Sequence, residues 1–180
     1  MNIAGINYES VNDGEGVRAV VYVSGCSHNC YNCHNPQTHD INYGVPFTEK
    51  LQNEIIENIK KRPFISGITW SGGDPLHENC LDDVLKFTNK IRLSLPQKNI
   101  WLYSGYEYQH IFRGTPSCLS KEGYNNYKRR KIIEAVDVFV DGRYIDSQRD
   151  VSLRWKGSKN QHVIDVQKSL EQNKMVLYCD

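Results

Sequence analysis

The sequence predicts an α/β protein in which parallel strands alternate with helices. Short apolar runs typical of buried strands alternate with segments whose apolar residues recur every three or four positions, as on one face of a helix. Glycine-containing turns follow four of these runs. The chain has 180 residues, of which 39% are hydrophobic, and neither a linker nor an internal repeat divides it. We therefore expect a single domain over residues 1–180.

The strands are placed by the apolar runs. Residues 17–24, VRAVVYVS, form a nearly continuous β-branched run, as in a strand buried on both faces. Similar runs predict further strands at residues 68–70, 99–105, 136–142 and 162–166, with a sixth candidate at 174–180. Six strands in 180 residues fall short of a full (β/α) barrel, which typically takes about 250. The predicted architecture is a partial (β/α) barrel of parallel strands.

The helices lie between these strands. Thr48 can cap a helix that ends before Pro63. Later helices are predicted at residues 81–91, 127–137 and 167–172. Parallel strands bind ligands outside their carboxyl ends. The turns at those ends should therefore line one pocket, and they read SGC, SGGDP, YSG and VDG.

The charge balance excludes several classes of partner. Lysine and arginine number 22 against 21 acidic residues, which gives a net charge of +1 and no broad basic surface for nucleic acid or an anionic membrane. No run approaches the ~18 apolar residues of a membrane span, and no leader-like segment opens the chain. We expect a cytoplasmic protein, whose clustered cysteines favour metal or redox chemistry over disulfides.

Three of the six cysteines fall within eight positions, as Cys26, Cys30 and Cys33. This spacing by itself is compatible with several kinds of site. A zinc site would need a fourth ligand, such as a nearby histidine, and a C-x-x-C redox pair would leave Cys26 unused. Three cysteines without a shared role do not suit a loop rich in Asn, His and Gly. A [4Fe–4S] cluster with three protein ligands uses all three thiolates and leaves one iron open.

The loop CSHNCYNC and the turn SGGDP together resemble the radical S-adenosylmethionine (SAM) enzymes. The resemblance implies a compact radical SAM core in which Cys26, Cys30 and Cys33 hold a [4Fe–4S] cluster. It also implies that the methionine moiety of SAM chelates the open iron. One electron from the cluster then cleaves SAM into methionine and a 5′-deoxyadenosyl radical.

The resemblance narrows to the activating proteins of anaerobic ribonucleotide reductase. Seven segments carry it in order: NDGEGVR, VSGC, CHNPQT, GITWSGGDPL, YSGY, VDVFVDGRYI and LRWKGSKNQHVIDV. It implies an enzyme whose radical removes a hydrogen atom from a glycine in the large reductase subunit. It also implies an external one-electron donor, such as flavodoxin or ferredoxin. The alternatives are activation of another glycyl radical enzyme, a small-molecule substrate, or a zinc-binding interaction module without enzyme activity.

Further residues are candidates for contact with SAM. The resemblance implies that the turn of Gly72, Gly73, Asp74 and Pro75 meets the SAM amino group, with the glycines allowing close backbone approach. Ser104 is placed either to bond a ribose hydroxyl or to cap a turn.

Asp141, position 32 and the remaining cysteines raise separate questions. Asp141 either contacts the cofactor or a partner, or it is simply the first residue of an Asp-Gly turn. Many relatives carry an adenine-contacting aromatic residue at position 32, where this chain has Asn32, so no adenine contact is assigned. The remaining cysteines are scattered and have no assigned role: Cys80, Cys118 and Cys179.

Overall fold

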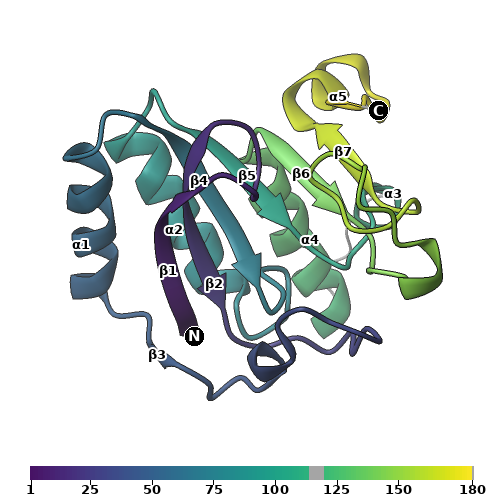
Figure 1. The fold of residues 1–180 in the computed structure, drawn as a ribbon, viewed down its shortest axis with the longest axis horizontal. Helices are drawn as coiled ribbons and strands as arrows, with labels where there is room; N and C mark the ends of the chain where they lie inside the picture. Colours follow the sequence, from purple (N-terminus) through teal and green to yellow (C-terminus); the bar gives the residue numbers. More distant parts are fainter. Residues whose placement is uncertain (114–119, 180) are drawn as a thin grey trace.

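The computed structural model describes residues 1–113 and 120–179. Within these ranges, seven strands form one open, mixed sheet in the order β3-β1-β2-β4-β5-β6-β7 (Figure 1). The strands are Asn2–Ser10 (β1), Val17–Val23 (β2), Val45–Pro46 (β3), Ile65–Gly72 (β4), Asn99–Tyr103 (β5), Val138–Asp141 (β6) and His162–Asp165 (β7). The α/β class is confirmed.

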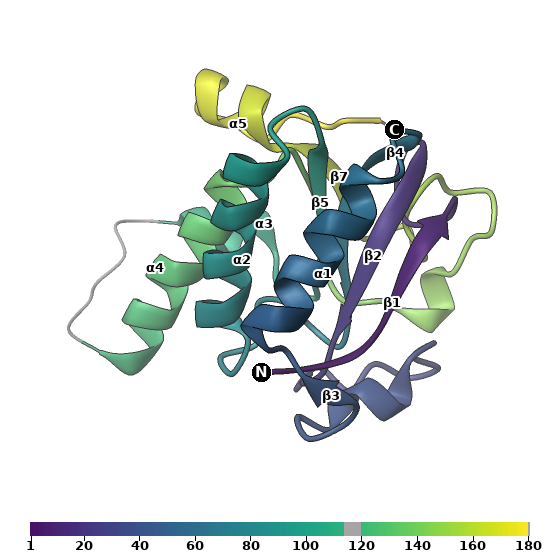
Figure 2. The same ribbon diagram turned by 90° about the vertical axis from the view of Figure 1, so that its left-hand side faces the viewer.

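The helices pack mainly on one face of the sheet. Figure 2 shows α1, α2 and α4 side by side on that face, while loops occupy the other. The α-helices are Glu49–Lys60 (α1), Leu81–Ser94 (α2), Tyr108–Phe112 (α3), Lys121–Glu134 (α4) and Val166–Gln172 (α5), and short 3₁₀ turns span Pro36–His39 and Asp146–Gln148. No helix in these ranges has both the length and the apolar character to cross a membrane.

Local capping explains where two of the helices begin. Thr48 caps α1 as predicted, since its side chain accepts a hydrogen bond from the Leu51 N–H. Helix α4 begins at Lys121 rather than near Tyr127, because Ser120 accepts a hydrogen bond from the Gly123 N–H. The first turns of α4 are polar, so apolar periodicity alone could not reveal them.

The prediction that all strands are parallel is wrong at the two edges of the sheet. Strands β2, β4, β5 and β6 are parallel, but β1 pairs antiparallel to β2 and was not predicted. Strand β7 is antiparallel to β6, because residues 142–161 contain no crossover α-helix that could carry the chain back for parallel pairing. The candidate strand at 174–180 contributes only an isolated bridge from Leu177 to Ile164 in its described part.

The helical face holds the larger core, and the opposite face holds a smaller one. In the larger core, Trp70 of β4 packs edge to face on Phe87 of α2. On the other face, Trp101 packs with Val140 and the partly buried Trp155. Both cores lie against the faces of the sheet. The loops at the carboxyl ends of the strands are therefore not needed for core packing and can hold catalytic or binding residues.

Arg18 is fully buried in β2 and joins three strands. Its guanidinium donates to the Thr69 hydroxyl at 2.6 Å, the Ile68 carbonyl at 2.7 Å and the Asn99 side-chain oxygen at 2.7 Å. Burial lowers the pKa of Arg18 to about 10, so the side chain remains charged at neutral pH.

We expect Arg18→Leu to lower the free energy of unfolding by about 3 kcal/mol, because it leaves buried acceptors without donors. Urea unfolding measures this change. Arg154→Leu is the control, since the Arg154 side chain is exposed and lies over the Trp155 ring. Equal losses in the two variants would contradict a structural role for the buried network.

Candidate active site

One cavity of about 470 Å³ lies at the carboxyl ends of the central strands. It is lined by residues from all four glycine-containing turns that follow β2, β4, β5 and β6. Representative lining residues are Cys26, Gly72, Gly73, Ser104, Gly105 and Gly142. The expectation that these turns share a pocket is confirmed.

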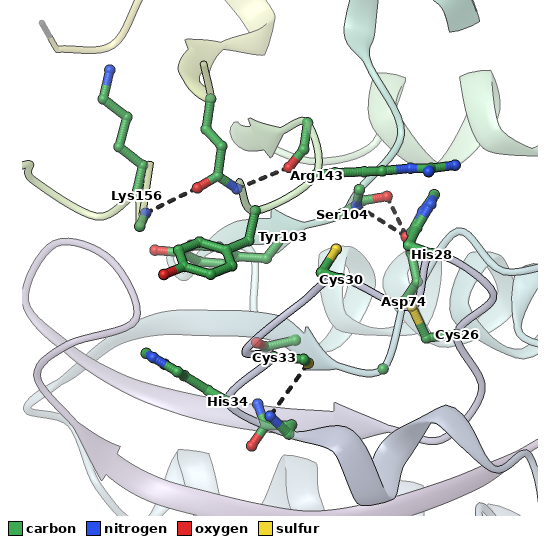
Figure 3. Close-up of a pocket in the computed structure, with 18 of the residues that line it drawn as sticks. Cys26, His28, Cys30, Cys33, His34, Asp74, Tyr103, Ser104, Arg143 and Lys156 are labelled. Carbon is green, nitrogen blue, oxygen red and sulfur yellow. Dashed lines mark hydrogen bonds and ion pairs between the residues drawn. The ribbon is translucent and has the colours of Figure 1, made fainter. Parts of the chain in front are cut away.

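The three clustered cysteines all line this cavity, each partly buried (Figure 3). Their loop turns sharply, with positive φ at Gly25, Asn29 and Asn32. The Cys33 N–H donates to the Cys30 carbonyl at 3.2 Å. This local winding brings thiols that are separated in sequence to the wall of one space.

Burial raises the pKa of Cys26 to about 11, although backbone N–H groups of His28 and Asn29 oppose the rise. Burial also raises the pKa of Cys30, opposed by the Tyr144 N–H and by Arg143. Both thiols are therefore protonated at neutral pH in the metal-free chain. Metal binding must displace these protons.

The cysteine set fits an iron–sulfur cluster better than a single ion. Within the described residues, no three His, Cys, Asp or Glu side chains are arranged to hold one metal ion. A cluster does not require such convergence, because each thiolate binds a different iron. The Asn35 N–H donates to Cys33 Sγ at 3.4 Å, the type of hydrogen bond that tunes cluster sulfur.

The glycine turn packs directly against the cysteine loop. The Gly73 N–H donates to the Val23 carbonyl at 2.8 Å, and the Asp74 N–H donates to the Gly25 carbonyl at 2.8 Å. Gly72 has φ +101, and a Cβ there would lie 2.7 Å from the Val23 backbone. The glycines thus permit close approach of the two loops, in addition to lining the cavity.

Asp74 and Ser104 line the cavity and are hydrogen-bonded to each other. The Ser104 hydroxyl donates to Asp74 Oδ1 at 2.8 Å and accepts from the Tyr106 N–H at 3.1 Å. Ser104 therefore caps the turn after β5, which is one of its two predicted roles. Its position in the cavity wall leaves a ribose contact as a hypothesis.

Asp141 and Pro75 are buried and are not among the residues that line the cavity. The Asp141 carboxylate accepts from the Tyr108 N–H at 2.8 Å, the His162 N–H at 3.1 Å and the His162 ring at 2.9 Å. It organises the turn between β6 and β7. A direct cofactor contact by Asp141 stays a hypothesis.

Sequence reasoning missed much of the cavity wall after β6. Arg143, Tyr144 and Lys156 line the cavity from residues 142–161, and none of them was singled out from the sequence. His28, which stands between two cysteines and was not singled out from the sequence, also lines it. No spacing signal marks these positions, because an irregular loop brings them into place.

The other cysteines lie apart from the triad. Cys80 is fully buried in the larger core and donates to the Ser24 carbonyl at 3.5 Å. Cys179 packs against the smaller core. Cys118 lies outside the described residues.

Comparison with known proteins shows which family this chain belongs to. A family model described as a 4Fe-4S single cluster domain matches residues 12–164. The anaerobic ribonucleoside-triphosphate reductase-activating protein of Escherichia coli K12 is 36% identical over 152 residues, covering 84% of this chain and 90% of the relative. The chain belongs to this family of activating proteins.

Two further members show the breadth of the activating-protein family. The protein of Haemophilus influenzae is 34% identical and covers 83% of this chain and 88% of its own. That of Enterobacteria phage T4 is 30% identical and covers 84% and 85%. The resemblance inferred from the motifs is confirmed. The chain carries a 4Fe-4S cluster domain, whose match spans the cysteine loop and every lining residue named above.

Proposed function

We propose that this chain is a radical SAM activase that installs a glycyl radical on an anaerobic ribonucleotide reductase. The observation that carries the proposal is one shared cavity lined by the three cysteines and the glycine turn, in a member of the activating-protein family. The relatives are named for the reductase that they activate, and the same target follows for this chain.

The residues of the cavity divide into two groups by role. Cys26, Cys30 and Cys33 would hold a [4Fe–4S] cluster with one open iron, and the backbone of Gly72 and Gly73 would receive the amino group of SAM. When bound, the cluster and SAM supply a one-electron cleavage that yields methionine and a 5′-deoxyadenosyl radical able to take a hydrogen atom from glycine. The residues of the chain itself would bind and orient the cluster and SAM and would shield them from water.

The loop after β6 supports this shielding role. Residues 142–161 have no α-helix, and yet they wall one side of the cavity with Arg143, Tyr144 and Gln161. Gln161 fixes the loop, since it donates to the Gly142 carbonyl at 2.8 Å and accepts from the Gly157 N–H at 2.9 Å. A fixed wall limits the access of water to a reactive radical.

The open sheet fits a protein substrate. Strands β3 and β7 are the two ends of the strand order and do not pair with each other, so the sheet does not close around the cavity. We regard the fold as a partial radical SAM barrel formed by one domain over residues 1–180. Its open side would admit a segment of the reductase. Reduced thiols suit the cytoplasm, where a flavodoxin or ferredoxin would donate the electron.

The reaction products test this function. Anaerobically reconstituted and reduced protein should convert SAM to methionine and 5′-deoxyadenosine. The anaerobic reductase should gain a carbon-centred electron paramagnetic resonance (EPR) signal, with the reductase incubated without this chain as the control. SAM turnover with a silent reductase would point to another glycyl radical enzyme or a small molecule. A colourless, iron-free protein would favour the zinc-binding module.

A further inference from the structure

His28 joins the cysteine loop to the rest of the site. It lies between Cys26 and Cys30, and its side chain is only 7% exposed. Its Nε2 lies 2.7 Å from Asp74 Oδ2, and its ring packs edge to face on Tyr106 at 4.8 Å. The ring also lies against Gly105, where it leaves no room for a Cβ. A solvent-exposed spacer would make none of these contacts.

Asp74 is the centre of this arrangement. Its Oδ1 accepts from the Leu76 N–H and the Ser104 hydroxyl, both at 2.8 Å. Its Oδ2 accepts from the Gly105 N–H at 3.0 Å and from His28. A carboxylate offers about four lone-pair sites, so these donors occupy the full set.

Four donors on one buried carboxylate have a consequence for its role. The Asp74 side chain is 1% exposed and holds no lone pair for the ammonium group of SAM. Its hydrogen bonds instead connect three separate loops: the cysteine loop, the turn after β4 and the turn after β5. Each of these loops lines the cavity.

We infer that His28 and Asp74 form a positioning pair, in which their hydrogen bond sets the cysteine loop at a fixed place relative to the glycine turn. The inference rests on the proposed function and adds a role for two residues that do not themselves touch the reacting atoms. The cysteine loop would carry the open iron, and the glycine turn would carry the amino group of SAM. The His28–Asp74 bond would thereby control how well one SAM molecule reaches both, whereas the fold would not depend on it.

The test uses full-length variants in the reconstituted, reduced state. His28→Phe keeps a ring over Gly105 but removes the donor to Asp74, and His28→Gln restores an N–H donor. His110→Phe is the control, because it breaks another histidine–carboxylate contact, the one to Glu107, at a residue that does not line the cavity. The measurements are iron and sulfide content, thermal unfolding, and the cluster EPR spectrum during titration with SAM.

We expect His28→Phe to retain its iron and to unfold only a few degrees below the wild-type temperature, because Asp74 Oδ2 keeps its Gly105 N–H donor. It should require about ten-fold more SAM to shift the cluster spectrum, which is the effect expected from losing a hydrogen bond to a charged group. His28→Gln should recover most of the response, and His110→Phe should match wild type.

Two outcomes would overturn the inference. One is a wild-type SAM response in His28→Phe, and the other is loss of iron from both His28 variants, which would make His28 a requirement of cluster assembly. Failure of the wild-type protein to hold iron or to respond to SAM would instead contradict the proposed function.

Discussion

Cys30→Ala should yield a folded protein that holds no [4Fe–4S] cluster. The wild-type chain should contain about four irons and the variant less than about one, because a cluster held by three thiolates does not survive on two. The fold should persist, since Cys30 lies in a loop outside both cores. We expect the free energy of unfolding of the metal-free proteins to differ by no more than about 0.5 kcal/mol. Anaerobic iron and sulfide analysis, with urea unfolding, measures both effects.

Cys80→Ala is the matched control, and its expected result is the reverse. Cys80 is fully buried in the larger core and is not among the residues lining the cavity. The variant should keep its iron and lose about 1 kcal/mol of stability through the small void it creates. If Cys30→Ala retained four irons, or if Cys80→Ala lost them, the assignment of the cysteine triad would be wrong.

The central strands and the cavity were predictable because their signals are local. The run at residues 17–24 is apolar enough to mark β2, and a glycine turn marks the end of each parallel strand. Parallel pairing then forces those ends to one edge of the sheet. The shared cavity follows from pattern and topology alone.

The edges of the sheet depend on information that local patterns do not carry. Strand β1, NIAGINYES, mixes polar residues with few apolar ones, because much of it is only partly buried. The antiparallel direction of β7 is set by the absence of a crossover α-helix over residues 142–161. A continuous apolar run predicts a strand, but it does not predict the direction in which that strand pairs.

The hydrogen-bond network of the site could not be predicted from the sequence either. The motif SGGDP drew attention to Asp74 as a cofactor contact, yet its carboxylate is filled by donors from three loops. His28 stands between two cysteines, and no motif marks it as a partner of Asp74. Contacts between residues 28, 74 and 104 depend on tertiary packing, which spacing in one sequence cannot report.

The second large effect is expected at Gly73, where the two loops of the site touch. A Cβ on Gly73 would lie 2.6 Å from the Gly25 carbonyl oxygen and 2.8 Å from that of Thr38. Neither oxygen can move freely, because the Gly25 carbonyl accepts from the Asp74 N–H and the Thr38 carbonyl accepts from the Gly25 N–H. Gly73→Ala must therefore push the cysteine loop away from the turn.

We expect Gly73→Ala to lower the rate of 5′-deoxyadenosine formation about 100-fold, since a displacement of about 1 Å in a reacting pair has an effect of that size. The free energy of unfolding should fall by about 1–3 kcal/mol through overpacking. Gly5→Ala is the control, because nothing lies within 4 Å of a Cβ at Gly5 in β1. It should leave the rate unchanged and raise the free energy of unfolding by at most about 1 kcal/mol. Wild-type SAM cleavage by Gly73→Ala would mean that close contact between the loops is not required for the chemistry, and that the glycines serve the fold alone.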